Sequence, residues 1–242
     1  MSIREPSWRP AFFPSGQWNA VSLLEIRETL RDWFVAWGLP EAFRVDNGWP
    51  WGSKGDLPTD LALWLIGLNV RVCWNPPRQP QKNGVVERSQ GTGKRWSEPG
   101  RCQSVDELQK RIDEMDAIQR SEYPLPDGRS RMELYPELRH SGRSYARRRE
   151  CVHWNWDLVA DHLAQYVTSR QVDSRGQVTI YKRNRYVGQA YAGQIIQSSF
   201  DPSTCEWIFR DLAGNQLRCQ TAQELTQNNI LHLNVTKRRG QT

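Results

Sequence analysis

Two carboxylates, Asp46 and Glu87, are the residues of this chain whose type and surroundings best suit metal-dependent chemistry. Asp46 belongs to the segment Arg-Val-Asp-Asn-Gly at residues 44–48, and Glu87 belongs to Asn-Gly-Val-Val-Glu-Arg at residues 83–88. A spaced pair of this kind is typical of the metal centre of a nuclease or a strand-transfer enzyme. Such a centre needs a third carboxylate, and the sequence offers no clear candidate for it.

Different elements are expected to position the two acids. The apolar run at 42–45 predicts a short strand over 42–46 that carries Asp46 at its C-terminal tip, where Asn47-Gly48 turns the chain away. Glu87 follows a proline-rich loop and lies in a helix-compatible stretch at 85–90. Helix starts favour acidic side chains, so Glu87 is also accounted for as a first-turn residue that compensates the helix dipole. The residues by themselves leave both roles open.

Together the two segments carry a longer pattern. Val-Asp-Asn-Gly at 45–48 is followed at 75–88 by Asn-Pro-Pro-Arg-Gln-Pro-Gln-Lys-Asn-Gly-Val-Val-Glu-Arg, which contains Pro-x-x-Pro-x-x-Asn-Gly-x-x-Glu-Arg. This resembles the second and third acidic segments of the DDE transposases of bacterial insertion sequences, in the retroviral-integrase superfamily. The forty residues between Asp46 and Glu87 exceed the usual family spacing, and we interpret the loop at 49–55 as an insertion at the rim of the site.

The resemblance implies DNA integration by phosphoryl transfer with two Mg²⁺ or Mn²⁺ ions, for which carboxylate oxygens are suitable ligands. In the family the acids that match Asp46 and Glu87 each hold one ion, which assigns catalytic and metal-binding roles to both residues. The implied partners are transposon ends and target DNA. The implied assembly is a homo-oligomer on that DNA.

The third acid of the family is an Asp on the first strand of the domain, where it bridges both ions. Here 21 residues precede Ser22, at which the first helix is expected, and Glu5 is the one acid before residue 20. This leaves room for one strand, within 7–13. We therefore expect an N-terminally incomplete core, weak metal binding and no catalysis by this polypeptide alone. Two alternatives stay open: a non-catalytic DNA-binding or regulatory derivative of a transposase, and a structural or partner-binding remnant without affinity for nucleic acid.

Helices and strands are expected to alternate around the two acids. Capping-box patterns beginning at Ser22 and Ser104 predict helices over 22–37 and 104–122. A helix near 59–67 and an alternating strand at 70–74 lie between them. The order helix, strand, helix, strand, helix resembles the second half of an RNase H-like domain. Residues 1–123 are therefore predicted to form an α/β, RNase H-like integrase core that lacks its first strands.

Residues 124–168 are predicted to form a basic linker that ends in a helix near 157–167. The stretch 124–150 is rich in proline and contains seven arginines: Arg129, Arg131, Arg139, Arg143, Arg147, Arg148 and Arg149. Such a linker either lies on DNA or is an ordinary solvated connection, and the sequence favours neither.

From residue 169 to residue 242 the pattern changes to short strands separated by turn signals. The strands are predicted at 177–181, 185–187, 194–200, 206–209 and 216–219, with one of the turns at 182–184. About five strands in some fifty residues favour a small all-β, SH3-like barrel. Its position after the core resembles that of the C-terminal DNA-binding domain of these transposases.

Basic side chains gather in two places. Residues 78–101 hold six basic residues against two acids, in a chain whose net charge is +6. A phosphate backbone would be attracted there, although a solvated, charged helix face is the common alternative. The residues expected to contact DNA are Lys82, Asn83, Arg88, Lys94 and Arg95 in the first place, and Lys182, Arg183 and Arg185 in the second. Trp74 and Trp96 are ambiguous, since an aromatic near a helix belongs either to the core or to a base-stacking surface.

Neither a membrane segment nor a secretion signal is indicated, because no run of about 18 apolar residues occurs and the N-terminus lacks an apolar core. We therefore expect a cytoplasmic protein. The five cysteines are an odd number without Cys-x-x-Cys spacing. This argues against a disulfide framework and against a structural zinc site.

Overall fold

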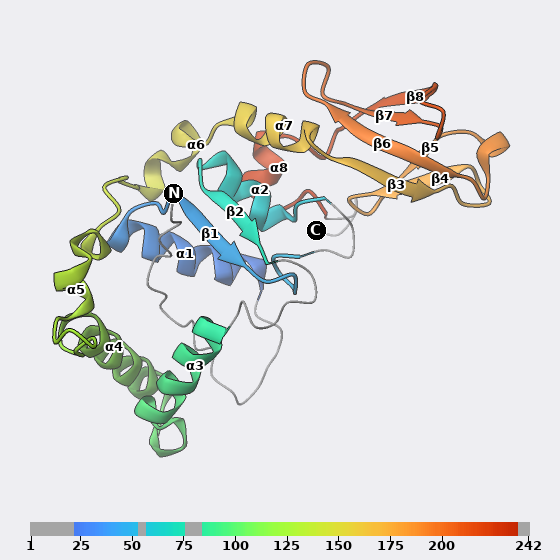
Figure 1. Cartoon of the computed structure of the whole chain (residues 1–242). Helices are drawn as coiled ribbons and strands as arrows, with labels where there is room; N and C mark the ends of the chain where they lie inside the picture. Colours follow the sequence, from blue (N-terminus) through green and yellow to red (C-terminus); the bar gives the residue numbers. More distant parts are fainter. Residues whose placement is uncertain (1–21, 53–56, 76–83, 237–242) are drawn as a thin grey trace. The chain divides into compact units, whose positions relative to one another are not determined.

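The computed structural model describes residues 22–52, 57–75 and 84–236, which form a mixed α/β protein with a four-stranded antiparallel sheet (Figure 1). The strand expected at 7–13 and the acid Glu5 lie outside the described residues. The chain divides into two compact units that interleave in sequence. The first unit is Met1–Arg44 with Asn75–Arg147, and the second is Val45–Trp74 with Arg148–Thr242. The predicted domain boundaries at 123/124 and 168/169 are not tested by this division and stay predictions.

The first unit opens with the helix α1 (Leu23–Trp37), and the helix predicted over 22–37 is confirmed. The Ser22 hydroxyl accepts the Glu25 backbone N–H at 3.2 Å, and the Glu25 carboxylate accepts the Ser22 backbone N–H at 2.7 Å. This reciprocal capping box satisfies backbone donors that the helix itself leaves unpaired. Leu30 and Phe34, four residues apart, are buried on the same face of the helix.

Two further helices of the first unit lie beside each other (Figure 1). The helix α3 spans Gly84–Ser97, a 3₁₀ turn follows at Pro99–Arg101, and α4 spans Val105–Ser121. The helix predicted over 104–122 is thereby confirmed, with Ser104 as its N-cap. The buried residues Leu108, Ile112 and Met115 recur at helical spacing and form one apolar cluster.

The first part of the predicted linker packs onto α1 instead of crossing solvent. It contains the short helix α5 (Arg131–Leu134) and a 3₁₀ turn at Pro136–Arg139. Beyond them, the Ser141 N–H donates to the Trp37 carbonyl at 2.8 Å, and the Arg143 guanidinium donates to the Pro40 carbonyl at 2.6 Å. The Arg147 guanidinium pairs with the carboxylates of Glu28 and Asp32 of α1, at nitrogen–oxygen distances of 3.0 and 2.6 Å. These two arginines therefore make contacts within their own unit, while the role of the other linker arginines stays a prediction.

The second unit is built around the helix α2 (Asp60–Gly67), whose eight residues are all buried. The strand β2 (Arg71–Trp74) follows α2, and the strand β1 (Ala42–Val45) ends at Val45, the first residue of this unit (Figure 1). The last residue of α2 has to be glycine, because a Cβ on Gly67 would lie 2.0 Å from the Trp154 ring nitrogen. That ring instead donates a hydrogen bond to the Trp64 carbonyl at 3.2 Å. The helix and strand predicted at 59–67 and 70–74 are confirmed.

Three helices of the second unit follow the first unit in sequence. They are α6 (Glu150–His153), which comes after a 3₁₀ turn at Arg147–Arg149, then α7 (Trp156–Ala164), and α8 (Gln227–Leu231) near the end of the described chain. Both α7 and α8 pack against α2. Within the described ranges, every helix is too short or too polar to cross a lipid bilayer.

The four-stranded antiparallel sheet has the order β3-β6-β7-β8 and appears in orange in Figure 1. Its strands are β3 (Val167–Gln171), β6 (Ile195–Asp201), β7 (Glu206–Arg210) and β8 (Gln216–Thr221). The register places Thr168 opposite Ser198 and Ser198 opposite Phe209, so these three side chains share the buried face. A bulge interrupts the pairing with β8 at Phe209/Arg210.

A separate hairpin is formed by β4 (Gln177–Ile180) and β5 (Arg183–Tyr186), followed by a 3₁₀ turn at Gln189–Tyr191. All five strands predicted in this region are present, with their ends moved by up to two residues. The sixth strand, β3, was not predicted. The helix expected over 157–167 ends at Ala164, and the polar segment that follows is drawn into a strand by pairing with β6.

The turn predicted at 182–184 is wrong, because the hairpin turns at Tyr181 and Lys182. Both residues have positive φ, 47° and 60°, while Arg183 and Asn184 already pair with β4. Left-handed backbone is costly for a residue with a side chain. At Tyr181 tertiary contacts offset this cost, since its hydroxyl donates to the Pro58 carbonyl at 2.9 Å and its ring lies 6.2 Å from the Trp207 ring.

Alkaline stability is expected to depend on Tyr181. Burial raises the pKa of its phenol well above the ordinary value of 10.0, and the charges of Asp60 and Glu224 raise it further. In the unfolded chain the phenol loses its proton near pH 10, whereas in the folded chain it keeps it, so the free energy of unfolding falls as the pH rises above about 10. Denaturant unfolding between about pH 8 and 11 should show that the free energy of unfolding falls less steeply with pH for Tyr181→Phe than for the wild type. Equal slopes would contradict this assignment.

Candidate functional site

Asp46 lies directly after β1, at the C-terminal tip predicted for it. The preceding residue, Val45, is buried and anchors the strand, while Asp46 itself is exposed. One carboxylate oxygen of Asp46 accepts the backbone N–H of Gly48 at 3.2 Å. This hydrogen bond of a side chain to the backbone two residues on is an Asx turn, which bends the chain away from the strand. The carboxylate is thus rigidly placed and open to solvent.

The loop after Asp46 is held at several points. The backbone N–H groups of Trp51 and Gly52 both donate to the Gly48 carbonyl, at 2.9 and 2.8 Å. The Trp51 carbonyl in turn accepts the Trp74 ring N–H at 3.1 Å and the Thr59 hydroxyl at 3.4 Å. These contacts tie the loop to the end of β2 and to the start of α2. The loop that follows Asp46 is therefore held by its own hydrogen bonds and by two neighbouring elements.

Glu87 lies in the first turn of α3, because this helix begins at Gly84. The helix predicted at 85–90 is confirmed, and the position fits both roles considered for this acid. The side chains of Glu87 and Arg88, and the whole of Lys82 and Asn83, lie outside the described residues. Asp46 belongs to the second unit and Glu87 to the first.

Among the described side chains, which do not include that of Glu87, no three His, Cys, Asp or Glu residues gather into a group that could hold a metal ion. All five cysteines are free thiols.

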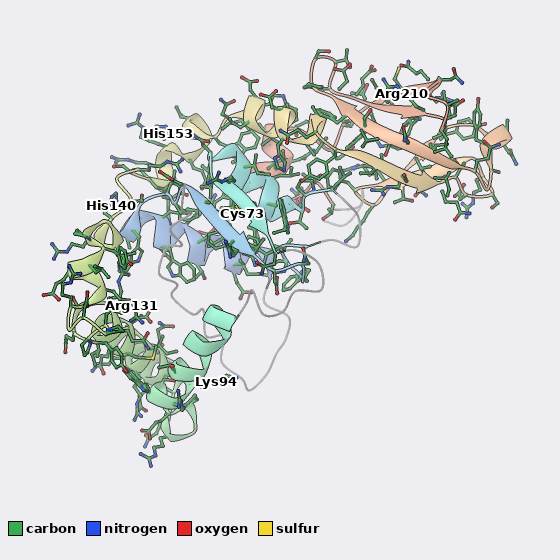
Figure 2. All side chains as sticks on the ribbon, in the orientation of Figure 1. Cys73, Lys94, Arg131, His140, His153 and Arg210 are labelled. Carbon is green, nitrogen blue, oxygen red and sulfur yellow. The ribbon has the colours of Figure 1, made fainter. Side chains whose placement is uncertain are left out.

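Among the described side chains of α3, which begin at Gly91, the exposed cations are Lys94 and Arg95, in the last turn of the helix (Figure 2 labels Lys94). The buried side of this turn is formed by Gly93 and Ser97, whose hydroxyl donates to the Gly93 carbonyl at 2.7 Å. Both cations are therefore on the solvent side and are available to an anionic partner. Cations at a helix C-terminus also stabilise the helix through its dipole, which is the simpler role for them.

The three basic residues of the β4–β5 hairpin lie in different surroundings. Lys182 is exposed at the turn, whereas Arg183 has its Nε atom 3.7 Å from the Glu224 carboxylate. Arg185 is 6% exposed, and one of its terminal nitrogens donates to both Glu224 oxygens at 2.7 and 2.6 Å. A guanidinium held in this way cannot reach a phosphate, so we remove Arg185 from the expected DNA contacts.

Glu224 is the centre of a buried polar cluster that the sequence analysis missed. It is 0% exposed and also accepts the Trp207 ring N–H at 2.8 Å. A cavity of about 400 Å³ adjoins it, lined by Arg183, Asn184, Arg185, Gln220, Thr221, Gln223 and Glu224. Neighbours in sequence could have indicated that both charged residues are buried. Glu224 stands between Ala222 and Leu225, which are buried, and Arg185 alternates along its strand with Val187, which is also buried.

The two ambiguous tryptophans have different surroundings. Trp74 is half-buried, donates to the Trp51 carbonyl, and stacks on His162 with 6.4 Å between the ring centroids. Burial lowers the pKa of this histidine, which favours the neutral imidazole at neutral pH. Trp96, by contrast, is 41% exposed. Trp74 therefore belongs to the internal packing, and Trp96 belongs to the surface.

No protein-family model matches this chain. Function is therefore inferred from the residues themselves and from the elements on which they lie.

Proposed function

We propose that this chain is a DDE transposase- or integrase-type protein that binds DNA for integration by metal-dependent phosphoryl transfer. The observation that carries the proposal is the pair of acidic segments at 45–48 and 75–88, with Asp46 exposed at a strand tip and Glu87 in a first helical turn. In this proposal β1, α2, β2 and α3 belong to an RNase H-like core. The four-stranded sheet and the β4–β5 hairpin belong to a small SH3-like barrel.

Asp46 and Glu87 would each hold a divalent cation in this proposal. The exposed carboxylate of Asp46, fixed by an Asx turn, has the hard oxygen donors that suit Mg²⁺ or Mn²⁺. When bound, a pair of such ions activates a hydroxyl and stabilises the leaving oxygen of the phosphodiester. A bridging third carboxylate is not assigned in this chain. We therefore propose weak metal binding and no turnover by this chain alone.

The metal-dependent part is tested by a plasmid-nicking assay in Mg²⁺ and in Mn²⁺. We expect the purified chain to give no nicking above background, because two carboxylates on separate elements leave the ions without a bridging ligand. Asp46→Asn should behave as the wild type does. Clear turnover that Asp46→Asn abolishes, and that the control variant Asp201→Asn at the end of β6 leaves intact, would contradict the proposed inactivity and would assign catalysis to this chain.

DNA would be held through phosphate contacts in this proposal. The exposed cations assigned to it are Lys94, Arg95 and Lys182. The half-buried Arg183, and Lys82, Asn83 and Arg88 of the motif segment, are assigned to it from the sequence. Contacts of this kind position a protein on DNA and release counterions, so their number sets the salt dependence of affinity. The same cations would serve a non-catalytic DNA-binding or regulatory derivative of a transposase. This derivative is the alternative function. DNA binding without nicking fits the alternative and the main proposal equally well.

DNA binding is tested by the salt dependence of affinity for a duplex. The wild-type logarithm of the binding constant should fall linearly with the logarithm of the salt concentration. In the double variant Lys94→Ala/Arg95→Ala we expect the magnitude of this slope to fall by about two, one for each lost phosphate contact. Lys110→Ala, at an exposed position on α4, should leave the slope unchanged. Weak, salt-insensitive binding of the wild type would reject a DNA-binding function of either kind.

A further inference from the structure

Two aromatic side chains of the first unit form an exposed pair. Trp96, in the last turn of α3, is 41% exposed, and Tyr123, just after α4, is 48% exposed. Their ring centroids are 5.7 Å apart and the ring planes are tilted by 55°. Large apolar surface left in contact with water in this way is a frequent mark of a binding surface.

The position of the pair follows from how α3 packs. Gly93 and Ser97 form the buried side of its last turn, so the three residues between them span the solvent side. These residues are Lys94, Arg95 and Trp96. An exposed indole thus lies within the same helical turn as two exposed cations.

Next to the pair in sequence, the exposed cations outnumber the acids that no cation neutralises. Glu98, the nearest acid on the α3 side, is neutralised by Arg101 at 3.0 Å and by Arg111 at 3.5 Å. Glu122, which precedes Tyr123, carries the opposing charge at the end of α4. Lys94 and Arg95 together exceed it. A flat, aromatic and anionic partner complements both the rings and this charge.

We propose that Trp96 and Tyr123 form a stacking platform for an unpaired DNA base, with Lys94 and Arg95 facing the neighbouring phosphates. A base inside a duplex has its faces covered by its neighbours, whereas an unpaired base offers a free face for stacking on an indole. The inference rests on the DNA-binding part of the proposed function and adds a substrate class to it: a strand with unpaired bases, such as single-stranded DNA or a frayed end.

The experiment compares two oligonucleotides of equal length and charge, oligothymidylate and an abasic backbone. The wild type should bind oligothymidylate more tightly than the abasic strand, because only the former can stack. Trp96→Ala should weaken binding to oligothymidylate by about tenfold and leave binding to the abasic strand within about twofold. Trp96→Phe, which keeps an aromatic ring, should restore most of the loss. Tyr135→Ala, at another exposed tyrosine of the first unit, is the matched control and should change neither.

The outcomes separate this inference from the function on which it rests. Salt-dependent duplex binding with no effect of Trp96→Ala on oligothymidylate would overturn the platform and leave DNA binding standing. An equal loss on the two strands would overturn it as well, since the ring would then act through folding or charge. Self-association that Trp96→Ala abolishes without any change in DNA affinity would assign the pair to a protein interface instead. If the wild type binds neither a duplex nor a single strand, both proposals fail.

Discussion

Replacing Glu224 by alanine is expected to lower the free energy of unfolding of the second unit by about 3–5 kcal/mol. Glu224 is fully buried and accepts hydrogen bonds from Arg185 and from the Trp207 ring. Its removal leaves the guanidinium of Arg185 buried without its counter-charge, and the desolvation cost of that charge is no longer offset. Denaturant unfolding followed by circular dichroism measures the loss as a shift of the midpoint.

Three variants make this expectation specific. Glu224→Gln keeps the size of the side chain but not its charge, so it should remain strongly destabilising. Glu224→Leu combined with Arg185→Met removes both charges and should recover much of the loss, because a buried ion pair and an apolar pair of similar volume are often close in stability. Glu206→Ala, at a half-buried position on β7, should cost less than about 1 kcal/mol. A loss for Glu224→Ala no larger than that of Glu206→Ala would refute the role given to the cluster.

Replacing Asp60 by alanine is expected to lower the free energy of unfolding by about 2–3 kcal/mol. Asp60 is 2% exposed, and its carboxylate accepts the Val235 N–H at 2.6 Å, the Thr236 N–H at 3.3 Å and the Thr236 hydroxyl at 2.6 Å. Alanine leaves these donors without a partner beside α2. Hydrogen exchange should show the amides of Val235 and Thr236 losing their protection before the rest of the unit does.

Two variants grade the effect at Asp60. Thr236→Val removes only the hydroxyl and should cost about 1 kcal/mol, while both backbone donors keep their acceptor. Asp60→Asn keeps one acceptor oxygen and should lie between Thr236→Val and Asp60→Ala. Unchanged exchange at Val235 in Asp60→Ala would show that the buried residues Leu233 and Val235, and not this carboxylate, hold the segment in place.

Much of the candidate site could be predicted because its signals are local. The apolar run before Asp46 predicted the strand, and Asn47-Gly48 predicted the turn, which the hydrogen bond from Gly48 to the Asp46 carboxylate now explains. The start of α3 near Glu87 followed from a proline-rich loop that ends at Asn83-Gly84. In each case neighbours in sequence supply the physical cause, so no knowledge of distant contacts was required.

The surroundings of the basic residues could not be predicted in the same way. Arg185 was grouped with Lys182 because both belong to one basic stretch, yet it pairs with Glu224, 39 residues later in the chain. Arg147 was assigned to a linker, yet it pairs with Glu28, 119 residues earlier. The local sequence around a basic residue does not reveal whether its side chain faces solvent or a carboxylate, because the partner that decides its role comes from a distant segment.

The sequence by itself determined the elements whose stability comes from nearby residues: the capped helices α1 and α4, the strand that carries Asp46, and the alternating strands of the C-terminal region. Only the tertiary structure decided that β3 is a strand, that the hairpin turns at Tyr181 and Lys182, and which cations remain exposed. The physical reason is the same in each case. Pairing with β6, packing against Trp207 and neutralisation by Glu224 are non-local interactions, and they outweigh the weaker local preferences of the residues concerned.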